Sequence, residues 1–287
     1  MIVQMTRTRN ECFLIKEMLP IWKKYADGFV FISDSSTDDT LEYLHANKEK
    51  YNILEILESN ENVKAEEYET NCRQKLFDVA CKYSNNLICL DTDEYLDGLA
   101  SKENLEFILD KNKNTTLMLQ WIQYTSKNKI RIDSPWDNVY HDRVGNFGFD
   151  AKFGKAFSHS SHLPYNHKAT RVDPQHLFIS HLQWLDKRWV GIKQYFWKVW
   201  DYVANLEQGV HIINRNDYDL SVNNFNWIYK DFNFPLQIRE DIYSTQSIED
   251  NFKLQYIKKY TKKYNIPNLG DWGMGIYDYA IKHNKVI

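Results

Sequence analysis

Two carboxylates stand two residues apart in a segment whose spacing suits metal binding. Asp91, Thr92, Asp93 and Glu94 follow directly on the apolar run LICL. Carboxylates at positions i and i+2, placed where a strand ends and the chain turns, can converge on one divalent cation. Mg²⁺ and Mn²⁺ prefer oxygen ligands of this kind and share them with phosphates. The alternative interpretation is the first turn of a helix, where acidic residues are also favoured.

Two further polar segments follow apolar runs earlier in the chain. Residues 29–40 read FVFISDSSTDDT, so Asp34 ends an apolar run and a Ser/Thr-rich turn comes next. A carboxylate in that place could accept hydrogen bonds from a base or a ribose, while the residues after it suit turn and helix-cap chemistry. The segment Arg7-Thr8-Arg9-Asn10-Glu11 follows the first apolar run, and a solvated loop is its simplest alternative.

The elements that must position these segments alternate between strand and helix. Strands are expected at residues 2–5, 28–33, 52–57 and 86–90, and helices at 11–25, 36–48 and 66–83. Alternation of this kind predicts a parallel sheet with helices on both faces. Ligands of such sheets bind beyond the carboxyl ends of the strands. Those ends carry Thr6, Arg7, Asp34 and Asp91.

From residue 115 the pattern changes. Strands are expected at 115–124, 128–133 and 176–182, and residues 134–175 are rich in loops. The final segment is aromatic-rich and expected to be mostly helical. Its first helix is indicated by apolar residues at helical spacing, namely Leu185, Trp189, Ile192, Phe196, Val199 and Val203. Trp197 and Trp200 lie off this stripe. Either residues 206–287 fold over them, or they line an acceptor groove or a homodimer surface.

The three polar segments, in this order, resemble those of GT-A glycosyltransferases, in particular the family 2-like group. That group typically carries an RNE segment after the first strand, an acidic Ser/Thr-rich segment after the second and a DxDE segment near residue 90. This chain has Arg9-Asn10-Glu11, Asp34-Ser35-Ser36-Thr37-Asp38-Asp39-Thr40 and Leu90-Asp91-Thr92-Asp93-Glu94-Tyr95-Leu96. The resemblance covers residues 1–100 well and 101–185 loosely.

The resemblance implies an α/β fold of GT-A type, with a Rossmann-like, mostly parallel sheet flanked by helices. The catalytic domain would span 1–185, with a nucleotide-binding half at 1–100 and an acceptor half at 101–185. Residues 186–287 would form a helical, aromatic-rich extension packed on it. The implied activity is transfer of a sugar from a UDP-, GDP- or dTDP-sugar to a hydroxyl of a glycan or other acceptor, with inversion.

The resemblance also assigns roles to single residues. Asp93 and Asp91 would hold Mn²⁺ or Mg²⁺, with His181 as a further ligand and His176 as its alternate. Asp34 would contact the base or ribose, and Arg73 would neutralise phosphate or orient the base. The other donor-binding candidates lie in the same segments, namely Thr6, Arg7, Arg9 and Thr92.

Two features leave alternatives open. The histidines of SHSSHLPYNH, His159, His162 and His167, could bind zinc, but no cysteine is near, and contacts to acceptor or phosphate are favoured. No acidic pair marks a catalytic base. Asp137, beside Trp136, and Asp173 are the main candidates, and the others are Asp133 and Asp150.

Composition limits the remaining classes. The net charge of −3 argues against a general nucleic-acid binder. The chain shows neither a signal peptide nor an apolar run long enough to span a membrane, so a cytoplasmic protein is expected. Its four cysteines lack CxxC spacing and are expected to be buried thiols. The alternative functions are a nucleotidyltransferase acting on sugar phosphates and a non-catalytic carbohydrate-binding or scaffold protein.

Overall fold

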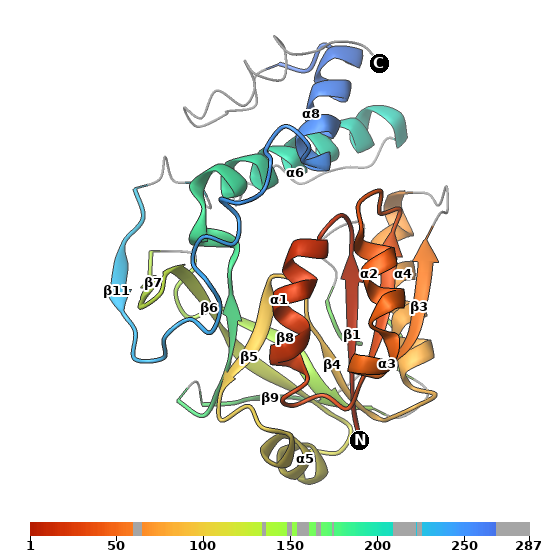
Figure 1. Cartoon of the computed structure of the whole chain (residues 1–287), viewed down its shortest axis with the longest axis vertical. Helices are drawn as coiled ribbons and strands as arrows, with labels where there is room; N and C mark the ends of the chain where they lie inside the picture. Colours follow the sequence, from red (N-terminus) through yellow and green to blue (C-terminus); the bar gives the residue numbers. More distant parts are fainter. Residues whose placement is uncertain are drawn as a thin grey trace. The chain divides into compact units, whose positions relative to one another are not determined.

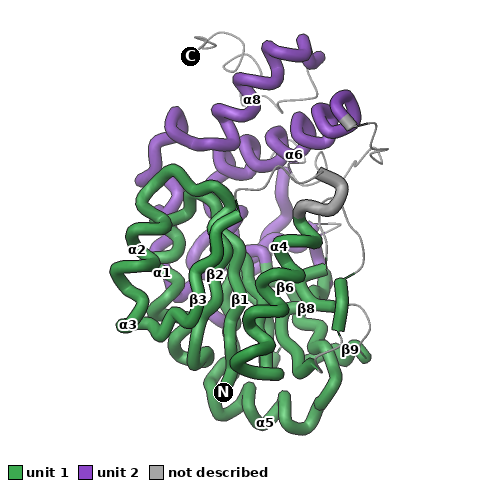
Figure 2. The backbone as a smooth tube through the Cα atoms, turned by 90° about the vertical axis from the view of Figure 1, so that its right-hand side faces the viewer, with its two compact units in different colours: residues 1–122, 139–181 green, residues 123–138, 182–287 purple. Residues whose placement is uncertain are grey.

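A computed structural model describes residues 1–59, 65–133, 136–147, 151–153, 161–164, 168–173, 175–208, 222 and 226–267. The chain forms two compact units (Figure 2). Unit 1 comprises Met1–Ile122 and Val139–His181, and unit 2 comprises Gln123–Asn138 and Leu182–Ile287. None of the described helices combines the length and the apolar character that crossing a membrane requires.

Unit 1 contains a sheet whose first half is parallel (Figure 1). Its strands are β1 (Ile2–Thr8), β2 (Gly28–Asp34), β3 (Ile53–Ser59) and β4 (Asn86–Cys89). They lie in the order β3-β2-β1-β4, and every neighbouring pair is parallel. This is the order of the first four strands of a Rossmann fold. The carboxyl ends of β1, β2 and β4 therefore meet at one edge of the sheet.

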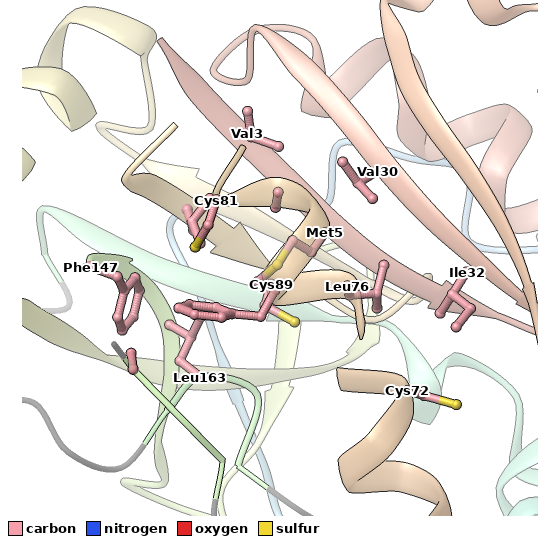
Figure 3. Packing of buried hydrophobic residues seen from close by; sticks show 14 residues of the cluster. Val3, Met5, Val30, Ile32, Cys72, Leu76, Cys81, Cys89, Phe147 and Leu163 are labelled. Atoms are coloured by element: carbon pink, nitrogen blue, oxygen red, sulfur yellow. The ribbon is translucent and has the colours of Figure 1, made fainter. Parts of the chain in front are cut away.

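Helices cover both faces of the parallel strands. They are α1 (Cys12–Trp22), α2 (Thr40–Ala46), α3 (Lys48–Tyr51) and α4 (Ala65–Ala80). On one face, α4 packs Leu76 and Phe77 against Val3, Val30 and other strand residues in a fully apolar cluster (Figure 3). On the other face, Trp22 of α1 lies 6.4 Å from the rings of both Phe29 and Phe31. Alternate side chains of β2 thus serve opposite layers, as the period of a strand requires.

The second half of the unit 1 sheet is mostly antiparallel. Its elements are β5 (Glu94–Gly98), α5 (Lys102–Lys111), β6 (Thr115–Ser126), β8 (Tyr140–Asn146), β9 (Lys168–Arg171) and β10 (Leu177–His181). Strand β8 lies between β4 and β6 and is antiparallel to both. Strand β10 runs antiparallel to β5. Strand β9, in contrast, pairs with β6 in parallel. The expectation that 134–175 is rich in loops did not include β8 and β9. The polar sequence YHDRVGN of β8 finds its partners only in the folded sheet.

Unit 2 contains the end of β6, β7 (Lys129–Arg131), η1 (Gln183–Leu185), α6 (Lys187–Gln208), β11 (Tyr229–Asp231) and α8 (Phe252–Lys263). The apolar stripe of α6 packs with Leu254 and Ile257 of α8. Trp197 and Trp200 are packed against this cluster, and the Trp200 ring lies 5.3 Å from that of Tyr256. Residues of the C-terminal segment thus contact the second aromatic face of α6.

The expected fold class is confirmed in its main features, a Rossmann-like sheet flanked by helices and a helical, aromatic-rich C-terminal part. Within the described part of the C-terminal segment, residues 226–251 form β11 and turns, and helix is found in α6 and α8. The four cysteines are buried and free, as expected. The division into domains at residue 185 stays a prediction.

We expect Phe77→Ala to destabilise the protein by about 3–5 kcal/mol, because it removes a fully buried ring from the α4 cluster. The ring of Phe77 packs edge-on against Phe147 at 5.4 Å and against Phe153 at 5.9 Å. Urea unfolding measures the change. Phe107, 66% exposed on α5, supplies the control, and its alanine variant should differ from wild type by less than about 0.5 kcal/mol. Equal effects of the two variants would contradict the packing described for Phe77.

Candidate active site

The three polar segments bind one another at the carboxyl edge of the parallel strands. Asn10 turns the chain in the left-handed region at φ 53°, which asparagine tolerates. Its side-chain oxygen accepts a hydrogen bond from the Thr37 amide at 2.6 Å, which joins the loop after β1 to the loop after β2. The Glu11 carboxylate accepts from the Thr92 hydroxyl at 2.6 Å, which joins it to the segment after β4. Side chains therefore fix all three loops relative to each other.

Glu94, the residue after the two aspartates, is the most heavily bonded carboxylate of the site. Arg143 of β8 donates to both of its oxygens, at 2.8 and 2.9 Å. The Trp121 indole donates to Oε1 at 2.8 Å, and the Asp91 amide donates to Oε2 at 3.1 Å. Each oxygen thus accepts two hydrogen bonds, which fills its acceptor capacity. Glu94 therefore fixes the turn and has no lone pair left for a ligand.

Burial by itself would raise the pKa of the Glu94 carboxyl group, but the Arg143 guanidinium outweighs it. The pKa of Glu94 consequently lies below its ordinary value. Arg143 has its pKa raised by Glu94 despite its own burial. The two side chains are 0% and 2% exposed, so the site contains a fully buried ion pair.

Asp93 and His181, which the sequence predicts as metal ligands, lie side by side. Strand β10 pairs with β5 so that His181 stands opposite Glu94, the neighbour of Asp93. Asp93 Oδ2 lies 3.4 Å from His181 Nε2, and the imidazole is stacked on Trp121 with 4.1 Å between ring centroids. The structure therefore brings the predicted carboxylate and imidazole together, across more than 80 residues of sequence.

His141 of β8 is a second imidazole beside Trp121. Its ring meets the indole edge-on with 4.5 Å between centroids, and within the described part of the chain its Nε2 has no hydrogen-bond partner. Burial and the nearby Arg143 lower the pKa of His141 to about 2. The ring is therefore neutral at ordinary pH and packs against Trp121 as an uncharged side chain.

Asp91 has a half-exposed side chain and contacts two groups. Its Oδ1 lies 3.4 Å from Arg73 Nη2, and its Oδ2 lies 3.0 Å from His162 Nε2. Burial opposes ionisation of Asp91, but His162, Arg73 and Arg143 outweigh it and hold its pKa well below the ordinary value. Arg73 also reaches Glu69 and the Cys89 sulfur, each at 3.4 Å. Asp91 is thus a carboxylate set among positive groups.

His162 contacts both Asp91 and Arg73, which the sequence did not predict. The sequence favoured an acceptor or phosphate contact from this histidine, and its only signal was the histidine density of 159–167. Tertiary structure brings it to Asp91, because Ser161 and the Leu163 amide both donate to Asp142 Oδ2 of β8. His159 and His167 lie outside the described residues, so the zinc alternative stays a prediction.

The remaining donor-side candidates are placed as follows. Arg7 Nη2 and Asp34 Oδ2 form a salt bridge of 2.7 Å. Burial lowers the pKa of Arg7, but Asp34 and Glu69 raise it more, so the pair is charged. Thr6 is buried and accepts from Gln4, and Arg9 is partly buried. Arg7 and Asp34 therefore neutralise each other at the edge where the sequence predicts the nucleoside.

The candidate bases lie in different settings. Asp173 is exposed at the start of the turn before β10, where it pairs with His176 at 3.7 Å. Since β10 places His181 at its other end, Asp173 and His176 lie roughly 13 Å or more along the strand from it. In unit 2, Asp137 is exposed beside Asn138, while Asp133 is engaged by Arg131 at 2.5 Å. Asp150 lies outside the described residues.

The carboxylate oxygens and imidazole nitrogens of the site suit a cation that binds both oxygen and nitrogen ligands. Among the described residues, ligand atoms of Asp91, Glu94 and His162 lie within 4.8 Å of one another. Glu94 is saturated, so Asp91 and Asp93 are the carboxylates left for a cation, each beside an imidazole. In the part of the chain that the structure describes, Asp91, Asp93 and His181 do not form a cluster of this kind. Carboxylates suit Mn²⁺ and Mg²⁺, whereas imidazole suits transition metals more than Mg²⁺.

No known family model and no curated protein sequence matches the chain. Among solved structures, it is similar to TarS of S. aureus, residues 1–349, in complex with UDP, with a TM-score of 0.41 and 12% identity over 98% of this chain and 80% of that one. It covers 49% of a longer TarS structure. The mannosyltransferase PcManGT from Pyrobaculum calidifontis, in complex with GDP-Man and Mn²⁺, gives a TM-score of 0.39 and 14% identity over 74% and 65% of the two chains.

HddC from Yersinia pseudotuberculosis gives a TM-score of 0.36 and 11% identity over 63% of this chain and 92% of that one. A mannosyltransferase is therefore among the solved structures that the chain resembles. These similarities are similarities of the backbone fold. The function proposed below is argued from the residues of the site.

We expect Arg143→Met to destabilise the protein by about 3–5 kcal/mol, because it leaves Glu94 charged and buried without its partner. The double variant Arg143→Met/Glu94→Gln should lose less, since the uncompensated charge is gone. Urea unfolding measures both. Arg188→Met is the matched control, because Arg188 pairs with Asp186 while 48% exposed and should cost less than about 1 kcal/mol. A loss in Arg143→Met no larger than in Arg188→Met would refute the role of the buried pair.

We expect His141 to make stability fall as the pH drops. Its pKa of about 2 in the folded protein lies below that of an unfolded histidine, so between these values the unfolded state binds more protons. The contribution of His141 to the free energy of unfolding is therefore fully present above about pH 6.5, and at pH 5 it is smaller by about 2 kcal/mol. His141→Phe should remove this part of the difference between pH 7.5 and pH 5 in urea unfolding. An unchanged difference would show that His141 does not titrate on unfolding.

Proposed function

We propose that the protein is a metal-dependent glycosyltransferase that moves a sugar from a nucleoside-diphosphate sugar to a hydroxyl group of a glycan or other acceptor. The single observation that carries the proposal is the Asp93–His181 pair of 3.4 Å at the turn where the three motif segments meet. Three separate features support the Asp93–His181 pair as the site. They are the spacing of the carboxylates, the position of the turn at the carboxyl edge of the sheet, and the register of β10, which brings His181 to Asp93.

The donor side of the proposal uses the residues of the carboxyl edge. Asp34, paired with Arg7, would accept hydrogen bonds from the base or ribose. Arg73, charged and 3% exposed, would face the diphosphate from beneath. Thr6 in β1, Arg9 in the loop after β1 and Thr92 in the turn after β4 are further donor-binding candidates at the same edge. A charged group held by a rigid scaffold stabilises developing negative charge without reorganisation of the site.

Asp91, Asp93 and His181 would hold the divalent cation, with Mn²⁺ preferred because one ligand is an imidazole nitrogen. When bound, such a cation supplies Lewis-acid stabilisation of the leaving nucleoside diphosphate. The chain itself contributes orientation: Glu94 fixes the turn, and Trp121 fixes the plane of His181 through stacking.

The acceptor hydroxyl needs a base if the sugar is transferred with inversion. Asp137 and Asp173 are the proposed candidates for this base, and Asp173 precedes β10, whose other end carries His181. Proton transfer to a positioned carboxylate typically contributes a factor of about 10²–10⁴ to the rate. The competing nucleotidyltransferase reading is disfavoured by Met5–Glu11, which lacks the glycine of a phosphate-binding loop.

We expect Asp93→Asn to abolish sugar transfer and donor hydrolysis, because it removes a charged ligand while keeping the shape of the side chain. Activity is measured with UDP-, GDP- and dTDP-sugars, with Mn²⁺ set by EDTA buffering. Asp110→Asn, at an exposed position of α5, is the control and should keep wild-type turnover. Near wild-type turnover of Asp93→Asn would sink the metal role. A wild-type protein that binds nucleotide sugars without hydrolysing or transferring them would identify a binding protein.

A further inference from the structure

The Nε2 atom of His162 faces two groups that it cannot satisfy together. Arg73 Nη2, a donor, lies 2.8 Å from it, and Asp91 Oδ2, an acceptor, lies 3.0 Å from it. Both distances are within hydrogen-bond range. A ring nitrogen that carries a hydrogen can donate to Asp91 but cannot accept from Arg73, and one without a hydrogen has the reverse capacity. One of the two contacts is therefore always unmet, whatever the tautomer.

The backbone on both sides of His162 is anchored. Ser161 and the Leu163 amide are both bonded to Asp142 Oδ2, one on each side of His162. Leu163 is 0% exposed and belongs to the apolar cluster beneath α4, where Figure 3 shows it near Phe147. The His162 side chain is 12% exposed. The imidazole is therefore held over Asp91 and Arg73 from outside the site.

The two competing partners are the two groups that a nucleoside diphosphate and its cation would engage. A phosphate oxygen that accepts from Arg73 leaves Nε2 free to donate to Asp91. A cation that binds the Asp91 carboxylate leaves Nε2 free to accept from Arg73. Either event removes the unmet contact at His162 Nε2. Ligand binding therefore relieves an unfavourable contact within the protein, and this relief favours binding.

We propose that His162 is a positioning residue that holds Asp91 and Arg73 in place before the donor binds and releases one of them when it binds. This inference rests on the proposed function. It gives His162 a part in donor affinity that requires no contact between the ring and the donor. It also explains why a residue outside the three motif segments lies between a buried arginine and a metal-binding carboxylate.

Two substitutions separate this role from a merely structural one. Glutamine can donate from its amide nitrogen to Asp91 and accept from Arg73 at its oxygen simultaneously, so His162→Gln satisfies both partners and retains them. Leucine offers neither bond, so His162→Leu leaves both partners available to the ligand. We therefore expect His162→Gln to weaken donor binding about tenfold or more, and His162→Leu to weaken it less. A structural histidine would give the opposite order, because glutamine is the closer substitute.

The affinities are measured by calorimetry with UDP, GDP, dTDP and CDP in the presence of Mn²⁺, and the melting temperature of each empty variant is recorded. We expect His162→Gln to melt at or above the wild-type temperature and to bind the nucleoside diphosphate more weakly than His162→Leu does. Binding of His162→Gln equal to or tighter than that of His162→Leu overturns it. His45→Gln, at an exposed position near the end of α2, is the matched control and should bind like wild type. If wild type binds none of the four nucleotides, the proposed function itself fails, and that result is distinct from a wrong order of the variants.

Discussion

The buried ion pair between Glu94 and Arg143 is the interaction on which the rest of the site depends. It joins the turn after β4 to β8, a strand that lies far along the chain. Glu94 also binds two indoles, since Trp121 donates to its side chain and Trp22 donates to its backbone carbonyl at 2.9 Å. Helix α1 and strands β5, β6 and β8 thus meet at one residue. A buried pair of this kind contributes little net stability, but removal of one partner costs much, so it favours a single arrangement.

The neighbouring acidic residues consequently have different roles. Glu94 is saturated with hydrogen bonds and serves the structure, whereas Asp91 and Asp93 each face one imidazole. Those imidazoles come from separate parts of unit 1, His162 from the segment bonded to Asp142 and His181 from the end of β10. Each of the two aspartates of this acidic turn therefore contacts its own histidine.

Rigidity at this edge comes from side chains more than from regular structure. The loops after β1 and β2 are joined through Asn10, and the loop after β1 is joined to the turn after β4 through Glu11. Arg7 and Asp34 add an ion pair across the same edge. Loops that carry functional groups need such support, since a site loosened by about 1 Å loses much of its effect.

The sequence by itself determined the parallel half of the sheet, its flanking helices and the edge where Thr6, Asp34 and Asp91 gather. Those elements follow from local periodicity and from the rule that parallel strands end together. It also determined that His181 ends a strand, because HLFISHL alternates as a strand does. It could not determine that β8 is a strand, since its Asp142 and Arg143 look like loop residues until Ser161, Leu163 and Glu94 surround them. The place of His162 was likewise decided only by tertiary structure. A hydrogen bond between residues 71 positions apart leaves no local pattern, and its geometry exists only once an apolar neighbour, Leu163, has been buried.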